Sequence, residues 1–247
     1  MTILYQIPGD VSAGPLGSAE LDRRLGLLQG WAAHGTIVEI ADAPGGPFSI
    51  ESAAEEAMCV APTLEALTRR ASEPDAVIVG CFGDPGLAAM REALDCPVIG
   101  PFEASLHLGA QLGHRVGVVT VVDGVVSVLD HLARGMGETL NYAGAVAVNV
   151  SVLDLRAHAA TLADTIVDAG RALVRERRAD VLVLGCMSMA FLGMADAIGD
   201  RCGVPILNPA RVALKTAEAM ASLGVRQSRR TYPRPAKPLR LGVKEHV

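Results

Sequence analysis

The stretch DAVIVGCFGDPG, residues 75–86, decides the fold. Its apolar run is short, unbroken and rich in β-branched residues, which is typical of a strand buried on both faces of a parallel sheet. The run ends in a Gly-Cys pair that contains Cys81, and the stretch ADVLVLGCMSM, residues 179–189, ends in the same way at Cys186. The two segments therefore indicate two buried strands that each carry a cysteine at the carboxyl end.

The repeat extends beyond these segments. An aspartate, Asp75 or Asp180, lies six residues before each cysteine. Residues 97–113 and 205–224 both read Pro, two apolar residues, a turn residue, Pro and a helical pattern that closes at Leu-Gly. Because the repeat is far longer than that of a solenoid, it indicates two similar α/β halves.

These halves predict the domain organisation. We expect residues 1–100 to form a first domain that residues 211–247 complete, and residues 101–210 to form a second. The class is α/β, with two pseudo-symmetric parallel-sheet domains and the active site in the cleft between them. Ligands in such sheets bind at the carboxyl ends of the strands, so the two thiols should face each other across the cleft.

Local patterns support this division. Ser52 and Glu55 form a capping box, which predicts that a helix begins there. A helix is also expected at 17–35, and strands are expected at 2–7, 36–41, 76–80, 115–120 and 181–185.

Composition excludes several classes of protein. The chain has 247 residues, half of them hydrophobic, and a formal net charge of −5. We therefore expect no nucleic-acid and no membrane partner, since either would require a basic face or a long apolar span. The start shows no signal-peptide pattern, so we expect a cytoplasmic protein. A basic run near the end is expected to be a solvated tail rather than an anion site; it contains Arg226, Arg229, Arg230 and Arg234.

Cysteine usage separates two groups. The five cysteines are scattered, odd in number and without a CxxC pair, so a disulfide framework or a zinc site is not expected. Cys59, Cys96 and Cys202 are predicted to be packing residues. Cys81 and Cys186 are predicted to be catalytic, because the duplication is hard to explain by packing alone.

Two opposed thiols can invert a carbon centre. One thiolate removes a proton as general base, and the thiol on the opposite face returns a proton as general acid. Cysteine suits both roles, since its free pKa is about 8.5 and its surroundings can lower it. Such a reaction needs no metal and no organic cofactor, and the glycine spacing around Cys81 is not that of a dinucleotide-binding loop.

The substrate-binding residues are expected in the loops beside the two cysteines. Backbone N–H groups near Gly80 and Gly83, with Gly185, Met187 and the Ser188 hydroxyl, would hold a developing negative charge. Thr120 would bind a substrate oxygen or cap the following helix, and Phe48 and Ile50 would form an apolar wall or simply belong to the core. The loop residues Pro8, Phe82 and Val121 complete the predicted set.

Other polar residues have competing interpretations. Asp84 is either a base or, more readily, a cap of a turn or helix start. Histidine is a common acid/base residue, so His107 and His114 are also candidates, but packing or solvent roles are favoured for both.

Five segments carry a resemblance to a known family: GPFSIES (46–52), GCFGDPGL (80–87), EASLHLGAQLGHRVGVVT (103–120), LGCMSM (184–189) and LGVRQSRRTYPRPAK (223–237). The chain resembles the aspartate/glutamate/hydantoin racemase superfamily, and most closely its hydantoin and allantoin racemase branch. The resemblance implies two pseudo-symmetric domains, a cofactor-independent mechanism that uses Cys81 and Cys186, and a homo-oligomer.

Two loops depart from the pattern of that family. Residues 6–10 read QIPGD where members commonly have Asn-Pro-Asn-Thr, and Cys186 is followed by Met-Ser-Met where Ala-Gly-Met is common. Both loops would line the pocket, so a substrate other than a simple hydantoin is an alternative.

The sequence thus predicts a racemase or epimerase of a small-molecule substrate, a cyclic ureide such as a 5-substituted hydantoin or allantoin. Alternatives on the same scaffold are an amino-acid racemase, an arylmalonate decarboxylase and a diacid cis–trans isomerase. No Arg or Lys adjoins either Gly-Cys pair, which disfavours the amino-acid and diacid substrates. A non-catalytic accessory or ligand-sensing protein is a further alternative.

Overall fold

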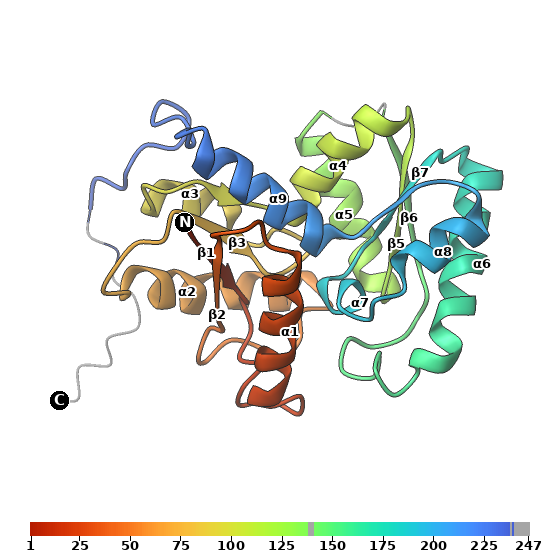
Figure 1. Cartoon of the computed structure of the whole chain (residues 1–247), viewed down its shortest axis with the longest axis horizontal. Helices are drawn as coiled ribbons and strands as arrows, with labels where there is room; N and C mark the ends of the chain where they lie inside the picture. Colours follow the sequence, from red (N-terminus) through yellow and green to blue (C-terminus); the bar gives the residue numbers. More distant parts are fainter. Residues whose placement is uncertain (138–140, 238, 240–247) are drawn as a thin grey trace.

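The computed structural model describes residues 1–137, 141–237 and 239 of the chain. Within these residues the strands form two parallel four-stranded sheets, with the orders β2-β1-β3-β4 and β6-β5-β7-β8 (Figure 1). The first sheet consists of β1 (Thr2–Gln6), β2 (Ile37–Ala41), β3 (Ala76–Val79) and β4 (Val98–Ile99). The second consists of β5 (Val116–Thr120), β6 (Tyr142–Ala147), β7 (Val181–Leu184) and β8 (Ile206–Leu207). The predicted α/β class with parallel sheets is confirmed.

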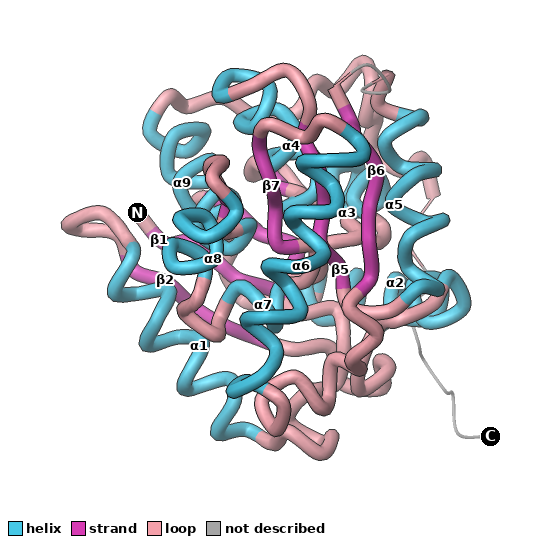
Figure 2. The backbone as a smooth tube through the Cα atoms, turned by 90° about the vertical axis from the view of Figure 1, so that its right-hand side faces the viewer, coloured by secondary structure: helices cyan, strands magenta, loops and turns pink. Residues whose placement is uncertain are grey.

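Helices connect the strands in both halves. The first half contains α1 (Ser18–Trp31), α2 (Ala53–Thr68) and α3 (Leu87–Ala93), and α4 (Pro101–Leu112) leads to the second. The second contains α5 (Asp123–Gly135), α6 (Ala159–Arg177), α7 (Met187–Ala190) and α8 (Ala195–Cys202), and α9 (Pro209–Ser222) follows β8. Figure 2 shows that β5, β6 and β7 run in a direction clearly different from β1 and β2.

The two halves are equivalent in the hydrogen bonds that surround β3 and β7. Gly80 donates its N–H to the carbonyl of Gln6 at 2.7 Å, and Gly185 donates to the carbonyl of Val119 at 2.7 Å. At the other end of these strands, Asp75 accepts the N–H of Thr2. Asp180 likewise accepts the N–H groups of His114 and Arg115 just before β5. The repeated aspartates therefore fix the start of the central strand in each half.

A glycine precedes each cysteine because the chain crosses closely over the neighbouring strand. A Cβ on Gly80 would lie 2.7 Å from the Tyr5 ring and 3.0 Å from the carbonyl oxygen of Gln6. A Cβ on Gly185 would lie 2.5 Å from Cγ1 of Val118. A residue without a side chain fits best at either crossing, so the glycine before each cysteine is required by the fold.

The helices α4 and α9 begin in the two Pro-x-x-x-Pro segments, but different residues cap them. Asn208 caps α9 with its own side chain, which accepts N–H groups of Ala210 and Arg211. The residue before α4 is Gly100, and Asp84 from the other loop accepts two N–H groups at that end of α4 instead. The predicted capping role of Asp84 is therefore observed, although on α4 rather than on the helix that directly follows Asp84.

The core has three parts. The largest apolar cluster joins the facing sides of the two sheets and includes residues of α4 and α9. A second cluster lies between the other side of the second sheet and α6 and α8, and a third lies between the first sheet and α2 and α3. Helix α9 contacts β1, β3 and β4 of the first sheet. We therefore propose that the chain after residue 210 completes the first domain, as the sequence predicts.

The basic run near the end of the chain is only partly docked: Arg226, Arg230 and Arg234 are exposed, as expected of a solvated tail, and Arg229 is half-buried. Arg229 and Arg226 form ion pairs with Asp95, and Arg234 contacts the same carboxylate. Arg229 and Gln227 also donate to backbone carbonyls at the end of α3. These carbonyls lack partners within the helix, which explains why the basic and amide side chains bind there. None of the helices in the described ranges combines the length and hydropathy that crossing a membrane would require.

Candidate active site

A cavity of about 70 Å³ lies between the two halves, at the carboxyl ends of β3 and β7. It is lined by both candidate cysteines and by most of the predicted binding residues: Pro8, Phe48, Ile50, Gly80, Phe82, Gly83, Val121, Gly185, Met187 and Ser188. Its other lining residues are Ile7, Gly9, Val11, Leu16, Arg24, Ser49, Glu56, Val125 and Val152. Its surface is mostly apolar, with few polar groups, which is typical of a small-molecule site.

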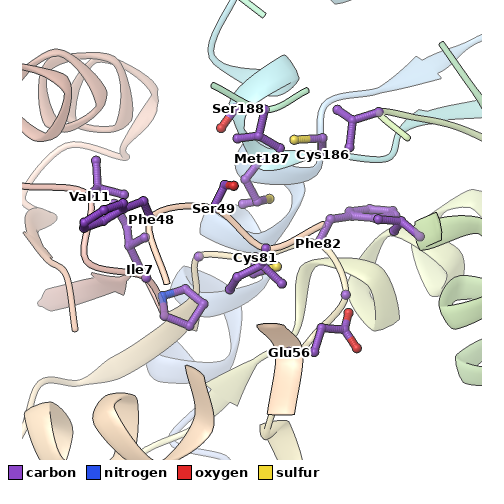
Figure 3. A pocket seen from close by; sticks show the side chains of 18 of the residues that line it. Ile7, Val11, Phe48, Ser49, Glu56, Cys81, Phe82, Cys186, Met187 and Ser188 are labelled. Carbon is purple, nitrogen blue, oxygen red and sulfur yellow. The ribbon is translucent and has the colours of Figure 1, made fainter. Parts of the chain in front are cut away.

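The two cysteines border this cavity from opposite sides. Cys81 follows β3 in the first half, and Cys186 follows β7 in the second. In Figure 3, Cys186, Met187 and Ser188 lie on one side of the space, and Cys81, Phe82 and Glu56 lie on the other. The structure thus brings the repeated thiols to one small cavity, because the equivalent strand ends of the two halves point at each other.

Polar groups around Cys186 offset part of the effect that burial has on its thiol. Burial raises the pKa of the Cys186 thiol, and hydrogen bonds from the backbone N–H groups of Met189 and Ser188 oppose that rise. The positive charge of Arg24 and the hydrogen bond from the Ser188 hydroxyl also lower the pKa of Cys186. Donors and a cation around a sulfur stabilise a thiolate.

The surroundings of Cys81 are different. Burial raises the pKa of this thiol well above its usual value, and one backbone N–H, from Gly83, opposes the rise. The charges of Glu56, Cys59 and Cys186 raise it further. Cys81 is nevertheless the more exposed of the two cysteines: Cys186 is 8% exposed and counts as buried, whereas Cys81 is half-buried.

Glu56 is a cavity residue that the sequence analysis missed. It lies in the first turn of α2, and its Oε1 occupies the space in which a Cβ on Gly83 would stand, 2.2 Å away. No side-chain hydrogen bond joins this carboxyl to any residue that the structure describes. Burial raises the pKa of Glu56 to about 7. The signal in the sequence is weak, because an acidic residue in a first helical turn is expected to face solvent.

Arg24 is the second missed residue, and it corrects an expectation about charge. No cation adjoins either Gly-Cys pair in the sequence, yet α1 brings Arg24, 3% exposed, to the cavity. Its Nε donates to Glu20 at 2.8 Å, and its Nη2 donates to the Ser188 hydroxyl at 2.9 Å. Its guanidinium also lies over the Phe191 ring. The sequence could not show this, because Arg24 is far from both cysteines along the chain.

Tyr5 lies beneath the site. It is fully buried in β1, and its hydroxyl has no hydrogen-bond partner among the described residues. Burial raises the pKa of this phenol above its usual value, and it interacts electrostatically with Arg24, Cys81 and Cys186. The phenol therefore stays neutral under both thiols.

One predicted binding residue is not at the cavity. Thr120 is fully buried, and its hydroxyl donates to the carbonyl oxygen of Gly185 at 2.9 Å. It neither lines the cavity nor caps α5, whose first turn follows Val122 without a side-chain cap.

The remaining cysteines are packed as expected: Cys59 in α2, Cys96 before β4 and Cys202 in α8 are all buried. Among the residues that the structure describes, no group of three or more His, Cys, Asp or Glu side chains is placed to hold a metal ion.

A family model and a curated relative both match most of this chain. The sequence model of the family described as Asp/Glu/Hydantoin racemase matches residues 23–217. The hydantoin racemase of Paenarthrobacter aurescens is 32% identical over 208 residues, which cover 83% of this chain and 87% of that protein.

Two solved structures resemble this fold over almost its whole length. The allantoin racemase of Pseudomonas fluorescens has a TM-score of 0.89 at 26% identity, with 98% of this chain and 100% of that chain covered. The allantoin racemase of Klebsiella pneumoniae has a TM-score of 0.86 at 26% identity, with 96% and 95% covered.

Proposed function

The chain belongs to the Asp/Glu/Hydantoin racemase family, whose relatives named above are isomerases, and we propose that it racemises a small cyclic ureide. The proposed substrates are 5-substituted hydantoins and allantoin, with Cys81 and Cys186 as the two acid/base groups. The observation that carries the proposal is the pair of thiols that border one cavity from equivalent positions in the two halves.

The reaction moves one proton from one face of the substrate to the other. A thiolate takes the proton from carbon 5, and the electron pair of that bond is delocalised onto the adjacent carbonyl oxygen as an enolate. The opposite thiol then gives its proton to the other face, so the carbon is inverted and the two sulfurs have exchanged protonation states. Neither step needs a redox partner, since no electrons leave the substrate.

The cavity walls suit an uncharged ring. Apolar side chains such as Ile7, Val11 and Phe48 form one side, and ring amides can bond to the few polar groups beside the cysteines. Backbone N–H groups of the two cysteine loops that are not bonded to the sulfurs would donate hydrogen bonds to the enolate oxygen and stabilise its negative charge. Phe48 is 49% exposed, so it also reaches solvent at the edge of the cavity.

Charged substrates fit less well. An amino acid brings both a carboxylate and an ammonium group, and each requires a free partner of opposite charge. Arg24 is the cation that lines the cavity, but its Nε and Nη2 are already bonded to Glu20 and Ser188. This engagement supports the ureide over the amino-acid and diacid alternatives.

The proposal is tested by optical rotation. Purified protein is given one enantiomer of allantoin and, separately, single enantiomers of several 5-substituted hydantoins, with L-glutamate, L-aspartate and an arylmalonate in the same panel. Buffer alone is run in parallel, because such ureides also racemise slowly by themselves. We expect rotation to vanish faster than in buffer for at least one ureide. Unchanged rotation for all ureides, with turnover of an amino acid or release of carbon dioxide from the arylmalonate, would reject the proposal.

The same set of compounds distinguishes a racemase from a non-catalytic ligand-sensing protein. Tight ureide binding in calorimetry without any acceleration of racemisation would favour sensing. We expect binding and turnover of the same compound.

A further inference from the structure

The protein environment of the two thiols is unequal, although their backbones are equivalent. The sulfur of Cys186 receives the N–H groups of Ser188 and Met189 and the Ser188 hydroxyl. The groups that face it from other elements are Arg24 of α1, Tyr5 of β1 and Cys81. Of these, Arg24 is the one that carries a positive charge.

The sulfur of Cys81 has a poorer set of donors. It receives the N–H of Gly83, and the groups that face it are Glu56 and Cys59 of α2, Tyr5 of β1 and Cys186. Each of these groups becomes negatively charged when it loses its proton, and none can carry a positive charge. A proton is therefore held more firmly on the Cys81 side of the cavity than on the Cys186 side.

The positive charge nearest to Cys186 is that of Arg24, which belongs to a cluster of ion pairs around one buried carboxylate. Glu20 is 2% exposed and forms ion pairs with Arg23, Arg24 and Arg156. Burial raises the pKa of Glu20, but the bonds from Arg23 and Arg24 outweigh this effect and lower it to about 2. This permanent carboxylate holds the buried guanidinium of Arg24 in place at the cavity, while Arg23 and Arg156 bind it from the solvent side.

Ser188 connects this cluster to the sulfur. Its hydroxyl oxygen accepts Nη2 of Arg24 at 2.9 Å. An oxygen that accepts from a guanidinium keeps its own hydrogen available, and this hydrogen can be donated to Cys186. A donor polarised by a cation is a stronger donor to an anion, so the chain Arg24–Ser188–Cys186 favours a thiolate at its end.

We propose that Arg24 is a positioning residue that, through Ser188, makes Cys186 the more readily ionised of the two thiols, and that Glu56 keeps the proton on Cys81. The consequence for turnover rests on the proposed function. The enantiomer whose proton points at Cys186 would meet the thiol that ionises more easily. Its mirror image would require the opposite state, with the thiolate on Cys81 and the proton on Cys186.

The test reads the thiols without any substrate. Iodoacetamide reacts with the thiolate, so the pH at which each cysteine reaches half of its maximal alkylation rate reports its ionisation. The rates are measured between about pH 5 and about pH 10 by mass spectrometry of the peptides that contain Cys81 or Cys186. We expect the midpoint of Cys186 to lie at lower pH. Exposure alone predicts the reverse order of reactivity, because Cys81 is the more exposed residue.

Variants separate the two halves of the proposal. Arg24→Gln should move the Cys186 midpoint up by roughly one pH unit and leave that of Cys81 in place, and Arg24→Lys should restore part of the shift. Glu56→Gln should move the Cys81 midpoint down. The matched control is Arg23→Gln, since Arg23 also pairs with Glu20 but donates to the Phe191 carbonyl instead of Ser188. It should leave the Cys186 midpoint unchanged.

A second variant keeps the test usable if the first does not fold. If Arg24→Gln does not fold, Ser188→Ala removes the same connection and should raise the Cys186 midpoint. A lower midpoint for Cys81 than for Cys186, or a Cys186 midpoint that neither variant moves, overturns the inference. Because labelling uses no substrate, the expected order in a protein without racemase activity would reject the proposed function alone. The reverse order in an active racemase would reject this inference alone.

Discussion

The Thr120 hydroxyl donates a hydrogen bond to the carbonyl oxygen of Gly185 at 2.9 Å, and so ties the end of β5 to the residue before Cys186. The first half has no such tie. Gly80 donates its N–H to the carbonyl of Gln6, just as Gly185 donates its N–H to the carbonyl of Val119. Gln6 therefore corresponds to Val119, and the next residue, Ile7, corresponds to Thr120. Ile7 has no hydroxyl to donate, so the pseudo-symmetry of the backbone does not extend to the side chains that hold the two cysteine loops.

Thr120→Val tests this tie. The substitution keeps the shape but leaves the Gly185 carbonyl without its side-chain donor in a buried place, so we expect a loss of about 1–3 kcal/mol in the free energy of unfolding. Urea titration measures it. Thr165→Val is the control, because Thr165 is exposed on α6 and bonds within its own helix. It should change stability by less than about 0.5 kcal/mol. Equal effects of the two variants would contradict the structural role of Thr120.

The glycines before the cysteines give a second prediction. Gly80→Ala and Gly185→Ala place a Cβ against Tyr5 and Val118 respectively, and such overpacking costs about 1–3 kcal/mol. Both variants should also lose most of their activity, because relief of the clash has to move the adjacent cysteine. Gly26→Ala is the matched control. Gly26 lies within α1 with open space at its Cβ position, so this change should stabilise the protein by about 0.5–1 kcal/mol. Full activity of the two other variants would show that the crossings are not tight.

Glu56 predicts a pH dependence of stability. Burial raises its pKa to about 7 in the folded protein, above the value of about 4.3 for an exposed glutamate. A carboxyl with a raised pKa stabilises the folded state below its unfolded pKa, and this contribution is lost as the pH rises through the folded pKa. Glu56→Gln has no charge to bury. The difference in unfolding free energy, variant minus wild type, should therefore increase between about pH 5 and about pH 8. A difference that is constant over this range would show that Glu56 is solvated.

Much of the fold could be predicted because the decisive signals are local. The apolar runs that end at Gly80 and Gly185 identify the buried strands, and Ser52 does accept the N–H of Glu55 as the capping box predicts. The boundaries were less accurate: the helix expected at 17–35 is α1, which ends at Trp31. The repeat also predicted which two cysteines would border one cavity, because the equivalent strand ends of the two halves point at each other.

The polar residues of the cavity could not be predicted, because their environment is created by distant segments. Glu20 and Arg24 are four residues apart on α1, a spacing that normally indicates an exposed ion pair. They are buried because the loop after β7 lies against α1. Thr120 was misplaced for a related reason. The end of a strand predicts closeness to the cleft, but the crossing of Gly185 over β5 determines which group its hydroxyl reaches.

The central claim is that Cys81 and Cys186 act on one molecule from opposite faces. Solvent deuterium exchange measures this most directly: each enantiomer of allantoin or of a 5-substituted hydantoin is incubated in deuterated buffer with wild type, Cys81→Ser or Cys186→Ser, and NMR follows the hydrogen at carbon 5. We expect wild type to invert both enantiomers with deuterium incorporated at that carbon, and each serine variant to invert neither above the buffer rate. The Cys59→Ser variant, altered at a packed thiol, should keep the inversion. Racemisation at the wild-type rate in either Cys81→Ser or Cys186→Ser would contradict the account.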